Sequence, residues 1–317
     1  MLTLPIAPVI ELAFDPIAQV GDWHVRLQTV ALAAIILVAL LLAARVARAT
    51  PVNLAHDPDA VDPVTGHPNH LRRDDLLYLA VAALPGAVIG GRIGYVLLHM
   101  PYYTANPAAI IDVGQGGYQL SLAVVGGTLT SAAVATLLDA PVRRWMHALI
   151  LPLLFAIAGG KLAMVLGGDG QGVPWDGPWA TAYLGAGPWL SLAPAVPSHP
   201  SQAYEAFATI GVIAVLAGVL AVGAFALRGA AAFLVGLSMW AIVRLLVAFT
   251  WRDPAAIGPL SIDQLLSVAI AAGALVLLAA GVTREGSRVS GPSGPDAPRF
   301  APEPDPDWSD PASRPHV

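Results

Sequence analysis

The chain has 317 residues, of which 56% are hydrophobic and 12% are charged, and its formal net charge is −5. Several apolar stretches exceed the ~18 residues that suffice for a membrane-spanning helix, which excludes an ordinary soluble protein. The absence of cysteine excludes disulfides, a thiolate nucleophile and cysteine metal sites.

Long apolar runs predict an all-α integral membrane protein with about seven transmembrane helices. In chain order the expected spans are roughly 26–48, 75–98, 119–138, 145–168, 204–227, 229–250 and 260–281. The third span is rich in Gly, Ser and Thr, and the number of spans drops by one if it re-enters the membrane instead of crossing it.

Basic residues alternate between the loops, which predicts the orientation. The first, third and fifth loops and the tail carry Arg45, Arg48, Arg72, Arg73, Arg143, Arg144, Arg228, Arg284, Arg288, Arg299 and Arg314. Loops 99–118 and 169–203 have no Lys or Arg, and the last loop of that side has only Arg252. The positive-inside rule then places the amino terminus outside and the carboxyl terminus in the cytoplasm.

The same pattern divides the chain into parts. We expect an extracytoplasmic amino-terminal segment at 1–25, a seven-helix transmembrane domain at 26–281 and a disordered cytoplasmic tail at 282–317, which is rich in Pro, Ser, Asp and Gly. Segment 169–203 is either an aromatic belt at the membrane interface or an extracytoplasmic cap over a site, and both interpretations can hold together. Its aromatic residues are Trp175, Trp179, Tyr183 and Trp189.

Histidines are the one hint of a metal site. His56, His67 and His70 lie in the polar loop 50–74, but their spacing is not that of a metal centre. We therefore expect a solvated loop there, and neither a metal nor a cofactor.

Three cations lie inside apolar runs. Lys161 is the only lysine of the chain, and Arg92 and Arg244 share its situation. They lie seven or eight residues before the expected outer ends of their spans, which predicts a common depth of roughly 10–12 Å. A cation at membrane depth costs at least ~2.5–3.5 kcal/mol on insertion scales. Because no Asp or Glu lies in the middle of a span, the expected partner is a bound anion such as a lipid phosphate.

Further polar residues are expected at the same membrane face. The run HPSQAYE at 199–205 opens span five, and Asp263 and Gln264 open span seven. Ser201, Glu205 and Asp263 also suit a helix start, where a hydroxyl caps the backbone and a carboxylate matches the helix dipole. That alternative does not explain His199, Gln202 and Tyr204. Paired glycines at 90–91, 126–127 and 159–160 indicate close helix packing.

Together these segments resemble the bacterial prolipoprotein diacylglyceryl transferases over about residues 20–282. The matching segments, in chain order, are GGRIGYVL at 90–97, GQGG at 114–117, GGTL at 126–129, AGGKL through GDGQG at 158–172, HPSQAYE at 199–205, RLLVAF with RDP at 244–254, and IDQLLS at 262–267. HPSQ-x-YE is the most specific of them.

The resemblance implies a multi-pass protein of the bacterial cell membrane. Members of that family move the diacylglyceryl group of phosphatidylglycerol onto the thiol of a lipobox cysteine and release glycerol 1-phosphate. The implied partners are phosphatidylglycerol, a prolipoprotein lipobox peptide and the membrane, with no nucleic acid. The residues expected to bind phosphatidylglycerol are Arg92, Lys161, Arg244, Asp169, Gly172, Gln202, Tyr204 and Glu205.

The chain also departs from the family pattern. Lys161 and Met164 stand where the family has arginine and asparagine, and Val125 and Ala248 where it has histidine and glutamate. The family's tyrosine–glycine pair after His24 is absent as well. Lys161 and Arg244 are expected to hold the phosphate, and His199 is the first candidate for the proton acceptor, with His24 the other.

Three interpretations therefore compete. The first is a diacylglyceryl transferase with Lys161, Arg244 and His199 as catalytic residues. The second is a non-catalytic relative that binds anionic phospholipid or lipoprotein precursors, which the lost histidine, tyrosine and asparagine favour. The third is an anion transporter, which the embedded cations suggest, although the chain lacks the interrupted helices expected of transporter repeats.

Overall fold

The computed structural model describes residues 9–52, 70–112, 116–185, 195–225 and 229–289, and the statements below refer to these residues. The chain divides into two units, 1–278 and 279–317. Predictions for His56, His67, Trp189, Arg228 and the tail beyond residue 289 lie outside the described residues.

Seven helices are long and apolar enough to cross a membrane, which confirms a mostly helical, multi-pass membrane protein. They are α1 (Leu27–Ala49), α2 (Arg73–Leu98), α4 (Leu120–Leu137), α5 (Val142–Val165), α6 (Ser201–Ala221), α7 (Ala231–Val247) and α8 (Ile262–Val289). The third predicted span is a full helix, α4, so the alternative in which it re-enters the membrane and leaves six spans is not needed. Short helices α3 (Met100–Ala105), η1 (Pro107–Ile110) and η3 (Ala248–Thr250) lie in the loops.

Helix α8 is longer than the predicted span. Its apolar part ends at Gly281, and its backbone stays helical to Val289, inside the segment for which the sequence predicted a disordered tail. Extending an existing helix adds one hydrogen bond for each residue that is ordered, and Arg284 and Glu285 are good helix formers.

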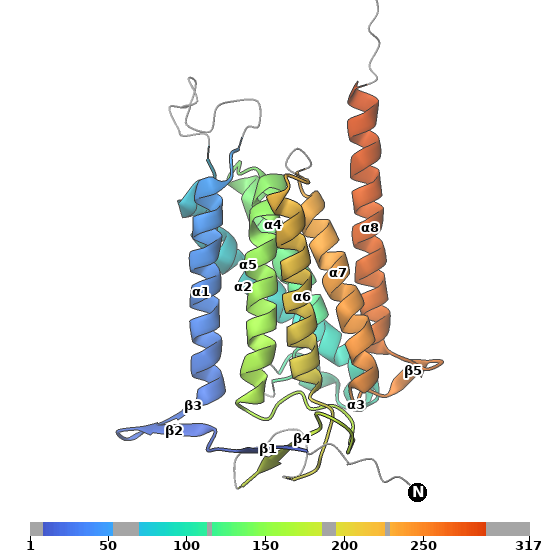
Figure 1. Ribbon diagram of the computed structural model, residues 1–317. Helices are drawn as coiled ribbons and strands as arrows, with labels where there is room; N and C mark the ends of the chain where they lie inside the picture. The colour runs from blue at the N-terminus through green and yellow to red at the C-terminus, as the bar shows by residue number, and fades with distance from the viewer. Residues whose placement is uncertain (1–8, 53–69, 113–115, 186–194, 226–228, 290–317) are drawn as a thin grey trace, which may run out of the picture. The chain divides into compact units, whose positions relative to one another are not determined.

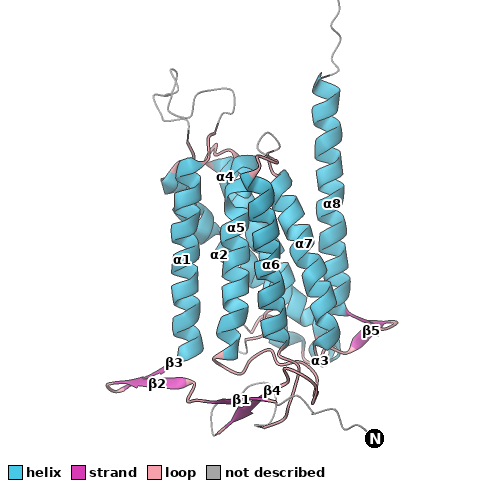
Figure 2. Ribbon diagram, viewed as in Figure 1, coloured by secondary structure: helices cyan, strands magenta, loops and turns pink. Residues whose placement is uncertain are grey.

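Short strands gather at one end of the bundle, together with α3 (Figures 1 and 2). We call this the strand-bearing end. Strand β1 (Ile10–Ala13) pairs in parallel with β4 (Thr181–Leu184). The strands β2 (Ile17–Val20) and β3 (Trp23–Arg26) form an antiparallel hairpin, and so do β5 (Ala255–Ile257) and β6 (Leu260–Ser261). The sequence did not predict these strands, which are too short to show a hydrophobic period.

Segment 169–203, from here on the cap segment, is attached to the bundle and to the amino-terminal segment. Its strand β4 pairs with β1, and the Tyr183 hydroxyl donates to the carbonyl of Val165 at the end of α5, at 2.8 Å. Burial raises the pKa of Tyr183 to about 12, so this hydroxyl keeps its proton at neutral pH. The cap segment is thereby fixed at the strand-bearing end.

Glycines allow helices α2 and α4 to touch through their backbones. A Cβ added at Gly90 would lie 2.2 Å from the carbonyl oxygen of Leu122, and one added at Gly126 would lie 2.1 Å from that of Gly86. Any side chain at these positions would push the helices apart. The close packing predicted for the glycine pairs is confirmed at Gly90 and Gly126.

The hydrophobic core has two parts. One surrounds Trp240, Ile150 and Leu154 on α7 and α5, and the other surrounds Trp145 near the start of α5. Both consist of closely packed apolar side chains from neighbouring helices. The polar residues of the next subsection lie beyond the first core, toward the strand-bearing end.

Candidate functional site

Four charged side chains from four helices form one ion-pair network. Lys161 Nζ on α5 lies 2.9 Å from Glu205 Oε2 on α6. Arg244 on α7 donates from Nη1 to Glu205 Oε1 at 2.9 Å and from Nη2 to Asp263 Oδ1 on α8 at 3.0 Å. The four side chains are at most 8% exposed. Two cations and two carboxylates thus balance one another inside the protein.

The network corrects one expectation. The sequence predicted that the embedded cations lack acidic partners, and this is wrong for Lys161 and Arg244. Helix α5 ends at Val165 and α7 at Val247, so both cations lie about 5–6 Å or less from their helix ends, not 10–12 Å. At that level they reach Glu205, the fifth residue of α6, and Asp263, in the first turn of α8.

The helix ends favour this arrangement of charge. Glu205 and Asp263 lie near helix amino termini, which carry a partial positive charge. Lys161 and Arg244 lie near helix carboxyl termini, which carry a partial negative charge. The effect is confined to the terminal turns, so it applies to Asp263 in the first turn of α8 and to Arg244 in the last turn of α7, where it reaches up to ~2 kcal/mol in partly buried geometries.

Two further side chains complete the network. The ring of Trp251 lies 4.4 Å from Lys161 Nζ, a cation–π contact that stabilises the ammonium where water is scarce. Gln119, the amino-terminal cap of α4, accepts a hydrogen bond from the backbone of Leu122 and donates one to Asp263. The network therefore connects α4, α5, α6, α7 and α8.

Several polar atoms beside the network are buried without a hydrogen-bond partner among the described residues. They include the donors Arg244 Nε, Trp251 Nε1 and Gln264 Nε2, and the acceptor Gln202 Oε1. A buried donor left unpaired costs about 1–3 kcal/mol, and such groups are normally satisfied by water or a ligand. Donors outnumber acceptors, so oxygen atoms of a bound molecule suit this region best.

Arg92 does not join the network. Its guanidinium donates to backbone carbonyls of the 109–117 loop, including Ile110 at 2.9 Å and Asp112 at 3.0 Å, and its charge lies over the ring of Tyr103. Its other hydrogen bonds reach Ala109, Gly116 and Gly117. The expectation that Arg92 binds an anion together with Lys161 and Arg244 is therefore not supported by its contacts, which are to backbone carbonyls.

The motif residues Asp169 and Gly172 shape the turn after α5. Asp169 accepts a hydrogen bond from Gln28 Nε2 on α1 at 2.9 Å. A Cβ on Gly172 would lie 2.1 Å from the carbonyl oxygen of Thr250 and 2.3 Å from Ser201 Oγ, so only glycine fits. Asp169 thus ties the turn to α1, and Gly172 lets the cap segment approach the start of α6 and the segment after α7.

The HPSQAYE run bends the cap segment into α6. The ring of His199 stacks on Trp175 with centroids 4.2 Å apart, and it packs edge-to-face with the ring of Tyr204 at a centroid distance of 6.1 Å. The Nδ1 atom of His199 is buried and has no hydrogen-bond partner among the described residues. Burial lowers the pKa of His199, which keeps the imidazole neutral near pH 7. Gln202 is buried at the same helix start.

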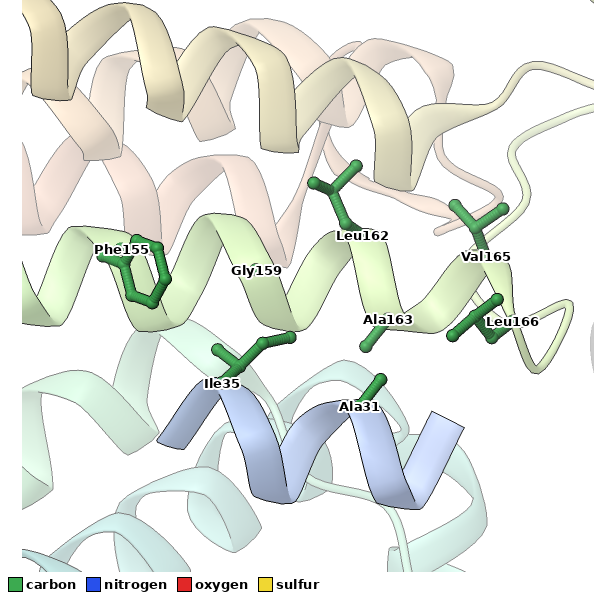
Figure 3. A pocket seen from close by; sticks show the side chains of 8 residues that line it. All are labelled: Ala31, Ile35, Phe155, Gly159, Leu162, Ala163, Val165 and Leu166. Carbon is green, nitrogen blue, oxygen red and sulfur yellow. The ribbon is translucent and has the colours of Figure 1, made fainter. Parts of the chain in front are cut away.

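An apolar groove of about 480 Å³ lies between α1 and α5 (Figure 3). Its walls are hydrocarbon, and they are formed by Ala31, Ile35, Phe155, Gly159, Leu162, Ala163, Val165 and Leu166. None of the predicted site residues lines it. A groove with such walls accepts hydrocarbon and offers no side chain for binding a headgroup or for proton transfer.

Sequence reasoning missed three residues around the network. Asp263 was placed among the polar residues at this membrane face, with a helix start as the alternative, but not among the binding residues, and Gln119 and Trp251 were not singled out. The signal for Asp263 was its position at the same face as Glu205. For Gln119 and Trp251 the sequence held no signal, because their contacts join distant parts of the chain.

Comparisons with known proteins point to one family. A family model described as "Prolipoprotein diacylglyceryl transferase" matches residues 16–280. Among similar curated proteins are those named phosphatidylglycerol–prolipoprotein diacylglyceryl transferase from Polynucleobacter asymbioticus and Bordetella parapertussis. The first is 36% identical over 34% of this chain and 42% of the relative, and the second is 34% identical over 41% and 50%. The matches thus span half or less of these curated relatives.

Proposed function

The chain belongs to the prolipoprotein diacylglyceryl transferase family, and on that basis we propose that it moves a diacylglyceryl group from phosphatidylglycerol to the thiol of a lipobox cysteine. The thiol comes from the substrate protein, in keeping with the absence of cysteine here. The proposed partners are phosphatidylglycerol, the lipobox peptide and the surrounding membrane.

One observation supports this proposal most strongly: the Lys161–Glu205–Arg244–Asp263 network with unpaired donors beside it. The network lies near helix ends, where the headgroups of a bilayer lie. A phosphate offers several acceptor oxygens to such donors. Charged hydrogen bonds in a water-poor site are strong, so they suit a group that gains negative charge during the reaction.

The proposed roles follow from these contacts. Lys161 and Arg244 bind the phosphate and stabilise the charge that develops as glycerol 1-phosphate leaves. Glu205 and Asp263 hold the two cations in place, so that little reorganisation is needed when the lipid binds. Asp169, Gly172, Gln202 and Tyr204 are proposed to lie around the bound headgroup.

We propose a supporting role for Arg92, because its hydrogen bonds to the carbonyls of Ile110 and Asp112 hold the described residues after α3 in place.

A transfer assay tests the function. The purified full-length chain is placed in vesicles of phosphatidylcholine and phosphatidylglycerol with a lipobox peptide, and the peptide is analysed by mass spectrometry. We expect the peptide to gain one diacylglyceryl group. A peptide with serine in place of its cysteine is the control and stays unmodified. An unmodified cysteine peptide would refute the transferase proposal.

A second candidate is a non-catalytic relative that binds anionic phospholipid or lipoprotein precursors. Val125 and Met164 replace the histidine and the asparagine that the resemblance led us to expect. The two cations and two carboxylates of the network also neutralise one another, which is equally compatible with a purely structural role. Lipid binding without any transfer in the assay above would favour this candidate.

The proposed orientation places the strand-bearing end outside the cytoplasm. Reporter fusions at Pro58, Arg144 and Gly291 are therefore expected to report a cytoplasmic position, and fusions at Ala105 and Trp179 an external one. The reason is the excess of arginine in the first and third loops and in the tail. A cytoplasmic signal from Trp179 would reverse the orientation and put the network on the wrong side for an exported substrate.

His199 is the proton acceptor that the sequence pattern suggests. Its neutral imidazole can take a proton, so replacing it with glutamine is expected to lower the transfer rate by ~10²-fold or more if it is the base. The activity would also fall as the pH drops below the lowered pKa of His199. The stack on Trp175 gives the residue a structural role as well. Wild-type activity in His199→Gln would rule out the role as a base.

A further inference from the structure

The segment that follows η3 lies next to the network. The ring of Trp251 covers Lys161 Nζ, and Arg252 Nε donates to the carbonyl of Gly172 at 2.9 Å. The carbonyl of Thr250 accepts a hydrogen bond from the backbone of Val173. These contacts fix residues 250–252 against α5 and the cap segment. Asp253 is the next residue of the chain.

Asp253 is a carboxylate that the network does not use. Its side chain is partly buried, and it makes no hydrogen bond or ion pair with the described part of the chain. It nevertheless lies within electrostatic reach of Lys161, Arg244, Asp263 and His99. Asp253 is therefore a carboxylate without a partner among the described residues, two residues after the tryptophan whose ring covers Lys161 Nζ.

These surroundings suit a proton acceptor. Burial, and to a smaller extent Asp263, raise the pKa of Asp253, whereas Arg244, His99 and Lys161 lower it, and the net shift is upward. A carboxylate with a raised pKa holds a transferred proton better than an ordinary aspartate does. Its backbone lies beyond η3, and the preceding residue, Arg252, is hydrogen-bonded to Gly172 of the cap segment.

We propose that Asp253 accepts the proton of the acceptor thiol during diacylglyceryl transfer. This inference rests on the proposed function. The thiol proton moves to a carboxylate oxygen of Asp253, and the sulfur attacks the glyceryl carbon that carries the phosphate ester. A C–S bond forms and the C–O bond breaks. Its electron pair goes to the phosphate oxygen of the leaving glycerol 1-phosphate, where Lys161 and Arg244 stabilise the added charge. Asp253 then returns its proton to water.

Asp253 has two advantages over His199 in this role. The charges of the network act on the pKa of Asp253 in addition to burial, whereas burial alone lowers the pKa of His199. The His199 ring is also enclosed by Trp175 and Tyr204. An unpaired carboxylate needs no rearrangement to receive a proton.

The test compares three variants of the full-length chain in vesicles of phosphatidylcholine and phosphatidylglycerol. Asp253→Asn removes the base, Asp253→Glu keeps it, and Asp22→Asn changes an exposed aspartate in the turn of the β2–β3 hairpin as a matched control. Transfer to a lipobox peptide is followed from pH 5 to 9. Bound phosphatidylglycerol is measured by native mass spectrometry as a readout that does not depend on activity.

We expect Asp253→Asn to lower kcat by ~10²-fold or more while bound lipid stays unchanged. The wild-type rate should rise with pH and level off once Asp253 is ionised. In Asp253→Asn that plateau should vanish, and the residual rate should rise about tenfold per pH unit up to the thiol pKa near ~8.5, because only preformed thiolate then reacts. Asp253→Glu should restore the plateau, and Asp22→Asn should match the wild type.

Each other outcome contradicts the proposal. A wild-type rate and pH profile in Asp253→Asn, or a lower rate with an unchanged pH profile, would overturn the role of Asp253 and leave the transferase function standing. A wild-type chain that binds phosphatidylglycerol but never modifies the peptide would overturn the proposed function and this role with it.

Discussion

Replacing Glu205 by glutamine is expected to destabilise the folded chain by about 3–5 kcal/mol, because it leaves two buried cations without their shared carboxylate. Glutamine has nearly the same shape, so the effect isolates the charge. The free energy of unfolding can be measured by SDS titration in mixed micelles. Among single substitutions in the chain this one should have one of the largest effects on stability.

Two variants sharpen this test. Glu11→Gln changes an exposed glutamate on β1 and should unfold like the wild type. The double variant Lys161→Met with Glu205→Gln removes one cation together with the carboxylate and leaves the Arg244–Asp263 pair, so it should regain much of the lost stability. A Glu205→Gln variant as stable as the wild type would show that the Glu205 carboxylate does not stabilise Lys161 and Arg244 in the folded protein.

Replacing Arg244 is expected to have the largest effect on function. Arg244→Ala should abolish measurable transfer and reduce the phosphatidylglycerol that co-purifies with the protein. Arg244 is bound by Glu205 and Asp263 at once, and its Nε is an unpaired donor beside the proposed headgroup position. Removing a donor that stabilises developing charge typically costs ~10²–10³-fold in rate.

Arg244→Lys covers the case in which the alanine variant fails to fold. Lysine keeps the charge but lacks the planar fork that reaches both carboxylates, so we expect a folded protein whose transfer rate is lower by ~10²-fold. Arg73→Lys, at an exposed position at the start of α2, is the matched control. Unchanged lipid binding and activity in folded Arg244→Lys and Arg244→Ala would remove Arg244 from the site.

The sequence predicted the seven spans well, because an apolar run of span length is a local property of the chain. It also predicted the close packing at Gly90 and Gly126, since small residues on a membrane helix let a neighbouring backbone approach closely. The paired strands were not predicted. Each has at most four residues, and β1 and β4 are joined by backbone hydrogen bonds between distant parts of the chain.

The sequence predicted that Lys161 and Arg244 are embedded cations, but it did not predict that two carboxylates neutralise them. Glu205 was expected to bind lipid and Asp263 to lie at the same membrane face, with a helix start as the alternative for both, and neither was recognised as a partner of Lys161 and Arg244. The depth of the cations was overestimated because the turn after Val165 was counted as helix. Arg92 differs for another reason: the carbonyls that bind it belong to a loop whose path no local pattern predicts.

The most direct test follows both products of one reaction. Phosphatidylglycerol labelled separately in its acyl chains and in its terminal glycerol is supplied to the wild-type chain with a lipobox peptide. We predict that the acyl label appears on the peptide cysteine and that an equal amount of the glycerol label is released as glycerol 1-phosphate. Acyl label that stays in the lipid while phosphatidylglycerol remains bound to the protein would contradict diacylglyceryl transfer.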